Sequence, residues 1–188
     1  MWFRRDLRLH DNTALYHALK NNNQVVPIFI FDKNILNQLE DKKDKRVAFI
    51  HSALQEMQQV LTTIGTTLEV YYGFPTEVFE KLLVKYKIEK VFVNHDYEPY
   101  ARERDKLIQH QISTTEATFH TFKDQVILEK NEVLKDDEKP YTVFTPYSKK
   151  WRAKLNDFYA RSYPTLKYAT NFLKIDTVAI PSLTFMGF

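Results

Sequence analysis

The stretch VVPIFIF, residues 25–31, is an unbroken apolar run with the length of a β-strand. A strand that is apolar at every position is covered on both faces, which is typical of a parallel sheet flanked by helices. Pro27 cannot donate a ladder hydrogen bond, but it lies near the start of the run, where that loss is tolerated. The run therefore predicts a buried strand of an α/β domain.

Segments of strand and helix character alternate on both sides of this run. Four more apolar runs have strand character: residues 2–3, 68–72, 90–94 and 118–122. Helices are expected after the capping residue Asn12, over residues 47–64 with Gly65 as the stop, and from Pro75 and from Pro99. In the last of these, Leu107, Ile108 and Ile112 are expected to face the core. The alternation predicts a doubly wound five-stranded parallel sheet, order 3-2-1-4-5, with helices on both faces.

The first strand is short for a central position in such a sheet. Only three residues precede Arg4, whereas strands usually contain about 5–6 residues. We therefore expect that further residues precede Met1 in the natural protein.

The last third of the sequence is rich in aromatic side chains and prolines. One helix is expected over residues 148–161. One interpretation buries its Trp151 and Phe158 and leaves its lysines in solvent. The other is a basic and aromatic surface for nucleic acid.

The change in composition suggests three parts. We expect an α/β domain over residues 1–130 and a closing segment with one helix over residues 131–163. Residues 164–188 show no periodicity and read as the start of an interdomain linker.

The composition excludes several kinds of site. The sequence has no cysteine, which excludes disulfides, thiolate-bound zinc and thiol catalysis. Its three glycines cannot form a Gly-rich dinucleotide fingerprint or phosphate loop. The six histidines lack metal-ligand spacing, so no metal site is expected. No apolar stretch reaches the roughly 18 residues of a membrane span, and the expected location is the cytoplasm.

A ligand site is expected where the direction of winding switches, beyond the carboxyl ends of the first and fourth strands. Carboxylates and an amide there, beside apolar side chains, suit a flat heterocycle with ring N–H donors. No nucleophile accompanies the carboxylates, so no catalytic residue is assigned. The alternative, that Asp6, Arg8 and Asp96 only pair with one another and cap helices, stays open. The candidate binding residues are Arg5, Phe31, Asp32, Ile35, Leu36, Arg46, Ile50, Asn94, Asp96 and Glu98.

Three motifs resemble those of the DNA photolyase/cryptochrome family. They are WFRRDLRLHDN at residues 2–12, NHDYEPY at residues 94–100, and YTVFTPY at residues 141–147 with Trp151 after it. They occur in the family's order and span nearly the whole chain.

The resemblance implies the family's N-terminal antenna domain, a doubly wound α/β domain that binds a light-harvesting chromophore. In the family, this chromophore passes excitation energy to FAD in a helical C-terminal domain, which binds damaged DNA and splits cyclobutane pyrimidine dimers. That FAD-binding domain is absent from these 188 residues. The full-length protein is therefore expected to be the enzyme, a carbon–carbon lyase. The chain alone is expected to be inactive, to bind DNA weakly or not at all, and to need no protein partner.

The resemblance also bears on the chromophore. Arg46 lies where antenna-binding members carry a pocket arginine, and Asp96 and Glu98 match pocket carboxylates of deazaflavin-type members. Ala101 stands where folate-binding members have a glutamate. Deazaflavin or flavin mononucleotide (FMN) is therefore favoured over reduced folate. Two other functions stay open: a cryptochrome-like blue-light photosensor, and a non-catalytic nucleotide-binding or scaffold domain with an empty pocket.

Overall fold

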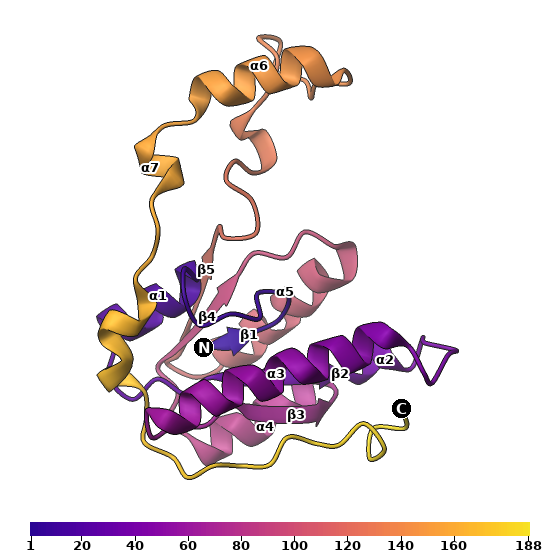
Figure 1. Ribbon diagram of the computed structural model, residues 1–188, viewed down its shortest axis with the longest axis vertical. Helices are drawn as coiled ribbons and strands as arrows, with labels where there is room; N and C mark the ends of the chain where they lie inside the picture. The colour runs from indigo at the N-terminus through magenta and orange to yellow at the C-terminus, as the bar shows by residue number, and fades with distance from the viewer.

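The computed structural model describes residues 1–188 as an α/β body with a projecting arm (Figure 1). The strands are β1 (Trp2–Phe3), β2 (Ile28–Asp32), β3 (Glu69–Gly73), β4 (Lys90–Asn94) and β5 (Thr118–Phe122). The helices of the body are α1 (Thr13–Asn21), α2 (Lys33–Leu36), α3 (Lys45–Thr63), α4 (Pro75–Lys85) and α5 (Pro99–Ser113). After them come η1 (Lys130–Glu132), α6 (Phe144–Lys154), α7 (Asp157–Ala160) and η2 (Thr165–Asn171).

All strand pairs are parallel, which confirms the α/β class. Hydrogen bonds give two ladders, β1-β2-β3 and β4-β5, and no ladder joins β1 to β4. The predicted continuous ladder of five strands is therefore not formed. The reason is the length of β1, because two residues leave little backbone to pair with β4.

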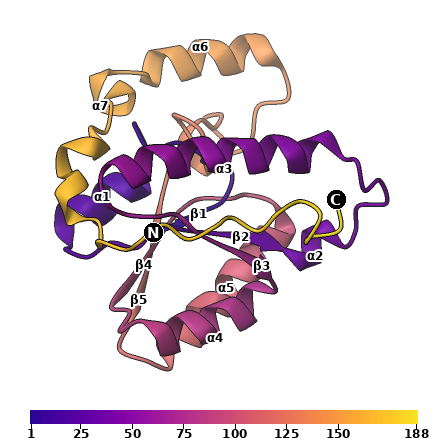
Figure 2. The ribbon, with the colours of Figure 1, turned by 60° about the horizontal axis from the view of Figure 1, so that its bottom comes forward.

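Helices cover both faces of the strands (Figure 2). Neighbouring side chains of β1 point to opposite faces, as strand geometry requires. Phe3 packs in a core with α1 and α3, whereas Trp2 packs in a second core with α4 and α5. In α5, Ile108 and Ile112 are buried as predicted, but Leu107 is exposed. Leu107 is about 100° around the helix from Ile108, which places it outside the buried stripe.

Local signals set most element ends. The Asn12 side chain accepts a hydrogen bond from the backbone N–H of Leu15 and caps α1 as predicted. Gly65 follows α3 with a φ of 76°, a conformation that favours glycine. The apolar run predicted a strand from Val25, but the ladder of β2 begins at Ile28. Val25 instead makes an isolated parallel bridge to Phe172.

The arm, residues 123–163, extends away from the sheet and carries α6 and α7 (Figure 1). The prediction of one helix over residues 148–161 is wrong. The helix α6 ends at Lys154, Leu155 is extended, and Asn156 caps the separate helix α7. No side chain of either helix is fully buried. Phe158 is exposed, contrary to the interpretation that buried it, and Trp151 is half-buried.

The C-terminal segment returns from the arm to the body. Residues 172–188 run beside α3, where the carbonyl of Val178 accepts from Gln58 at 2.8 Å and that of Pro181 lies 3.0 Å from His51 Nε2. Met186 is buried in the core that contains Phe3. None of the helices combines the length and the apolar character needed to cross a bilayer.

Glu69, at the start of β3, offers a test of the fold's buried electrostatics. Its carboxylate lies 2.6 Å from both Lys85 Nζ and Tyr86 Oη, and it also accepts from Tyr71. Burial opposes ionisation of Glu69, but these hydrogen bonds outweigh it and hold the pKa of the carboxyl below its ordinary value.

The change Glu69→Gln is expected to lower the free energy of unfolding by about 2 kcal/mol at pH 7, the scale of hydrogen bonds to a buried charge. Because the folded pKa is lowered, the contribution of Glu69 is present above the ordinary value of 4.5 and is lost as the pH falls below it. Urea unfolding at neutral and acidic pH measures both effects, with the exposed Glu80→Gln on α4 as the control. Equal losses in the two variants would contradict the assignment.

Candidate functional site

A polar cavity of about 390 Å³ lies at the carboxyl ends of β1 and β4. This is the place expected from the topology. None of its nine lining residues is hydrophobic: Arg4, Arg5, Asp6, Arg8, Asn94, His95, Asp96, Asp124 and Gln125. The loop after β1 forms one wall, the end of β4 another, and the first residues of the arm a third.

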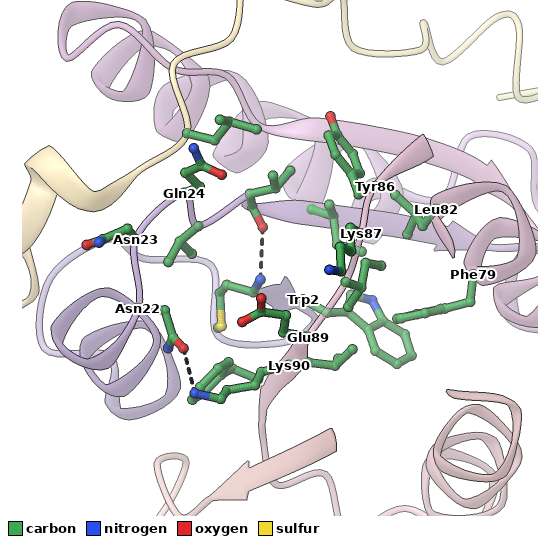
Figure 3. Close-up of a pocket in the computed structure, with 18 residues that line it drawn as sticks. Trp2, Asn22, Asn23, Gln24, Phe79, Leu82, Tyr86, Lys87, Glu89 and Lys90 are labelled. Atoms are coloured by element: carbon green, nitrogen blue, oxygen red, sulfur yellow. Dashed lines mark hydrogen bonds between the residues drawn. The ribbon is translucent and has the colours of Figure 1, made fainter. Parts of the chain in front are cut away.

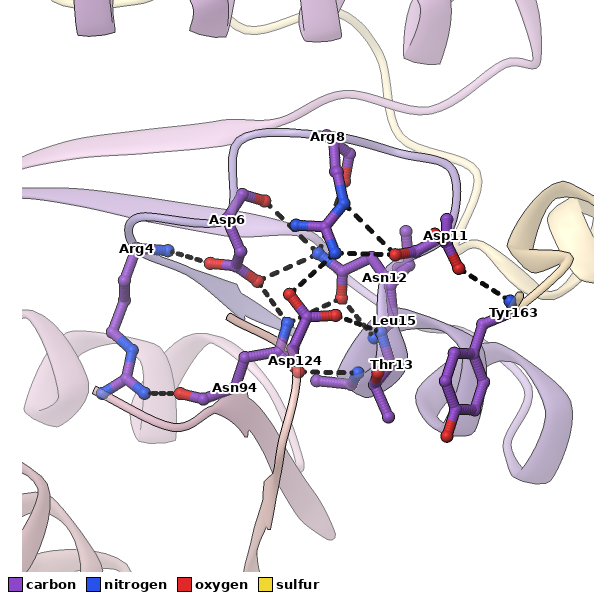
Figure 4. Close-up of polar contacts among 11 residues, drawn as sticks. Arg4, Asp6, Arg8, Asp11, Asn12, Thr13, Leu15, Asn94, Asp124 and Tyr163 are labelled. Atoms are coloured by element: carbon purple, nitrogen blue, oxygen red, sulfur yellow. Dashed lines mark hydrogen bonds and ion pairs between the residues drawn. The ribbon is translucent and has the colours of Figure 1, made fainter. Parts of the chain in front are cut away.

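Asn94 holds the base of this cavity together (Figure 4). Its side-chain amide donates to Asp6 Oδ2 at 2.6 Å and to Asn12 Oδ1 at 2.9 Å. Its side-chain oxygen, Oδ1, accepts from the backbone N–H of Ala14 at 2.9 Å. Both N–H groups of Asn94 are thus engaged with protein, and the side chain ties β4 to the β1 loop and to the start of α1.

Two of the cavity's arginines are held by carboxylates. The buried Arg4 side chain pairs with Asp105 at 2.5 Å and lies 5.3 Å from the centre of the Trp2 ring. Arg8 pairs with Asp124 at 2.8 Å. Asp124 in turn accepts from the backbone N–H of Thr13 at 2.8 Å, which anchors the arm to α1. Asp6 and Arg8 therefore serve the structure, as the alternative interpretation held, although not by pairing with each other.

Arg5 and Asp96 line the cavity, and with Glu98 they form a cluster that we call the rim. Arg5 Nη1 lies 3.5 Å from Asp96 and 3.6 Å from Glu98. The side chains of Arg5 and Glu98 are 56% and 66% exposed, whereas that of Asp96 is 9% exposed. Ion pairs at such distances with an exposed partner contribute little to stability. Arg5 and Glu98 are therefore open to solvent, and Asp96 is mostly covered.

Apart from Asn94, the other candidate residues do not line the polar cavity. Phe31, Leu36 and Ile50 share one core, on which the C-terminal segment packs through Met186. Ile35 is exposed.

Asp32 and Arg46 have local partners. Asp32 is the cap of α2 and accepts from the hydroxyl of Tyr100. Arg46 is turned to solvent and pairs with Asp44 at 2.5 Å. Hydrogen bonds from Arg46 lower the pKa of Asp44 to about 2.

The sequence analysis did not single out Tyr100, Asp124 or Glu129. Tyr100, in the first turn of α5, donates to Asp32 at the end of β2, and burial together with Asp32 raises its pKa to about 12. Asp124 follows β5 and could have been found from its place after a strand end. Glu129 comes from the arm and accepts from Tyr97 at 2.6 Å, with His95 Nδ1 at 2.8 Å. No sequence signal pointed to Glu129.

The sequence and the fold of this chain are both similar to those of known photolyases. The model of the family described as DNA photolyase matches residues 1–167. A deoxyribodipyrimidine photo-lyase of Synechococcus sp. is 34% identical over 152 residues, which cover 81% of this chain and 31% of that protein.

Solved structures give the same result. The archaeal photolyase from Sulfolobus tokodaii, determined with two FAD molecules, is 28% identical with a TM-score of 0.66, covering 82% of this chain and 35% of that chain. A class III photolyase from Agrobacterium tumefaciens shares the fold, with a TM-score of 0.78 at 24% identity, covering 97% of this chain and 36% of that chain. This chain spans about a third of the length of these relatives.

Proposed function

Because this chain belongs to the DNA photolyase family, we propose that it is the N-terminal light-harvesting domain of a deoxyribodipyrimidine photolyase. In the longer protein, a C-terminal domain carries FAD, binds damaged DNA and splits cyclobutane pyrimidine dimers in the light. The domain described above supplies an antenna chromophore and no catalytic residue. We propose weak or no DNA binding by this chain alone, no obligate protein partner, and the cytoplasm as its location.

The rim at the polar cavity is the observation that supports this proposal best. Asp96 and Glu98 offer carboxylate oxygens to ring N–H donors of a flat heterocycle, and Arg5 offers a cation to its carbonyl oxygens or to a phosphate. Ala101, buried in the first turn of α5, brings no carboxylate. A deazaflavin or FMN is therefore favoured over a reduced folate.

The remaining candidate residues extend the proposed site towards β2. Asp32 is connected to the start of α5 through Tyr100. The apolar side chains of Phe31, Leu36 and Ile50 share one core beside it. Asn94 supports the base, and Ile35 and Arg46 are exposed.

We also propose the complete strand order 3-2-1-4-5, with β4 beside β1. Arg4 donates to the backbone carbonyl of Asn94, and Trp2 packs in one core with Val91 and Val93, both of which support this neighbourhood. For the whole chain we propose the α/β domain over residues 1–130, a closing segment over 131–163 and an interdomain linker from 164 onward.

The chromophore can be tested on the purified chain. After dialysis against a deazaflavin, FMN or reduced folate, we expect the visible or near-UV absorption band of one of the first two to be retained. The double variant Asp96→Ala and Glu98→Ala is expected to lose that band. The matched control is Glu77→Ala with Glu80→Ala, two exposed carboxylates on α4. Retention of the full band by the first double variant would contradict the assignment of the rim, and no band with any compound would contradict a self-sufficient antenna site.

A further inference from the structure

Three cations lie over three tyrosine rings where α1 meets the end of the arm. Tyr16 on α1 is in edge-to-face contact with Tyr163 at the end of the arm and with Tyr168 on η2, with 5.3 and 5.7 Å between ring centres. In Figures 1 and 2, α1, α7 and η2 lie on the same side of the molecule. The rings and their cations form one continuous surface, which we call the basic–aromatic surface: Tyr16, Lys20, Arg161, Tyr163, Lys167 and Tyr168.

The rings hold the cations in place. Each cation lies near the centre of one tyrosine ring: Lys20 over Tyr16 at 5.4 Å, Arg161 over Tyr163 at 5.3 Å and Lys167 over Tyr168 at 5.9 Å. A cation at such a distance is attracted to the face of the ring. Because these long side chains are already positioned, they lose less conformational freedom when they bind an anion.

The charge of the three cations is not neutralised within the protein. None of them forms an ion pair with a carboxylate. Asp11 contacts the surface, but its Oδ1 accepts from a backbone N–H of the arm at 2.9 Å, and Asp157 on α7 pairs with none of the cations. Burial lowers the pKa of His17, and the positive charges of Lys20 and Arg161 lower it further. The surface therefore presents a net positive charge.

The same surface also presents hydroxyl donors. The hydroxyls of Tyr16 and Tyr168 have no hydrogen-bond partner in the protein, and Gln111 Oε1 is the one buried side-chain atom without a partner. Both hydroxyls are therefore in contact with solvent. Cations and phenolic hydroxyls are groups with which proteins bind phosphate oxygens. The rings themselves are half-buried and carry cations, so they are poorly placed to stack on bases.

We propose that the basic–aromatic surface binds the sugar–phosphate backbone of duplex DNA without reading its sequence. Contacts from cations and hydroxyls to phosphate carry no base information. Single strands are bound largely by stacking of their bases on aromatic rings, so covered rings favour a duplex. The proposed function gives lesion binding to the C-terminal domain, so this surface is an additional contact with DNA. It is independent of the antenna chromophore.

The number of cations sets the strength of this binding. Each neutralised phosphate contributes about −0.9 to the slope of log K against log salt, so three cations give a slope of about −2.7. Non-specific binding of this kind has dissociation constants on the order of 10⁻⁴ M at physiological salt. The surface therefore supports weak DNA binding by this chain alone, as proposed above.

Other exposed cations lack this arrangement. A cavity of about 290 Å³ at the amino ends of the strands has Lys87 and Lys90 in its lining (Figure 3). Lys90 donates to Asn22 Oδ1 at 3.0 Å, and neither lysine lies over an aromatic ring. Such side chains lose more conformational freedom when they bind an anion, so they serve as controls for the cations held by rings.

The test measures binding of a fluorescently labelled, undamaged duplex of about 20 base pairs to the whole chain, by anisotropy, between about 50 and 200 mM salt. The triple variant Lys20→Gln, Arg161→Gln and Lys167→Gln is expected to bind roughly tenfold more weakly at the lowest salt, with a slope near zero. The matched control changes Lys81, Lys87 and Arg102 to glutamine, three exposed cations that lie over no ring. It has the same net charge as the triple variant and is expected to keep the slope of the unmodified chain.

Two results would overturn the proposal. Equal losses in the triple variant and the control would mean that net charge alone attracts DNA. The second is binding of a polyglutamate peptide as tightly as the duplex at the same salt, which would assign the surface to acidic peptides instead. Neither result involves a chromophore, so the antenna function is tested separately.

Discussion

Replacing Asn94 with leucine is expected to lower the free energy of unfolding by about 3 kcal/mol. Leucine has a side chain of similar shape to that of asparagine, so the change mainly removes two hydrogen-bond donors and one acceptor from a buried position. The N–H of Ala14 is then left without a partner, and each buried polar group stranded in this way costs about 1–3 kcal/mol. The carboxylate of Asp6 also loses one of its hydrogen-bond donors. Urea unfolding of the variant and the unmodified chain measures the difference.

The matched control for this experiment is Asn37→Leu, the same chemical change at an exposed position beside α2. The control is expected to change the free energy of unfolding by less than about 0.5 kcal/mol. A loss below about 1 kcal/mol for Asn94→Leu would mean that water replaces the missing partners. The network at the base of the cavity would then not be what holds β4 to the β1 loop.

The second large effect concerns the 188-residue chain with a free amine at Met1, which is expected to lose stability as the pH falls from 8 to 5. Burial lowers the pKa of the Met1 amine from 8.0 to about 5. Between these values the unfolded chain binds a proton that the folded chain does not, so the free energy of unfolding falls with falling pH. One such group contributes about 3 kcal/mol over this range. Below about pH 5 both states are protonated, and this contribution stops changing.

Acetylation of the Met1 amine tests the origin of this pH dependence. The acetylated chain has no ionisable amine, so its stability is expected to vary much less between pH 8 and 5. Burial, together with Lys20 and Arg161, also lowers the pKa of His17, which contributes in the same direction. Both forms are therefore compared in a His17→Gln background. If the acetylated chain has the same pH slope as the free chain, the buried amine is not its cause.

Features that depend on near neighbours in sequence could be predicted, and those that depend on distant ones could not. The cap at Asn12 and the stop at Gly65 are fixed within four residues of chain, so their sequence signals were sufficient. One interpretation of the sequence buried Phe158, but burial requires a partner surface, and Phe158 is 65% exposed on the arm. The division of the sheet into two ladders likewise depends on how far β1 extends.

The candidate site divides in the same way. Topology alone placed Arg5, Asp96 and Glu98 together, because strand ends of a parallel sheet meet at one edge. Arg46 was expected among them, yet the carboxylate two residues before it, Asp44, is its partner. The competing local pair is visible in the sequence, but only geometry shows that it forms.

The two ends of the arm are held by one short loop of the body. Arg8 pairs with Asp124 where the arm leaves, and Asp11 accepts from the backbone N–H of Tyr163, at 2.9 Å, where it returns. The arm is therefore a closed loop, and the entropy of closing a flexible loop grows only with the logarithm of its length. Doubling the length of the arm would raise the free energy of loop closure by about 0.6 kcal/mol. Through loop closure alone, changes in the length of the arm that spare the contacts of Glu129 with Tyr97 and His95 therefore cost the folding of the body little.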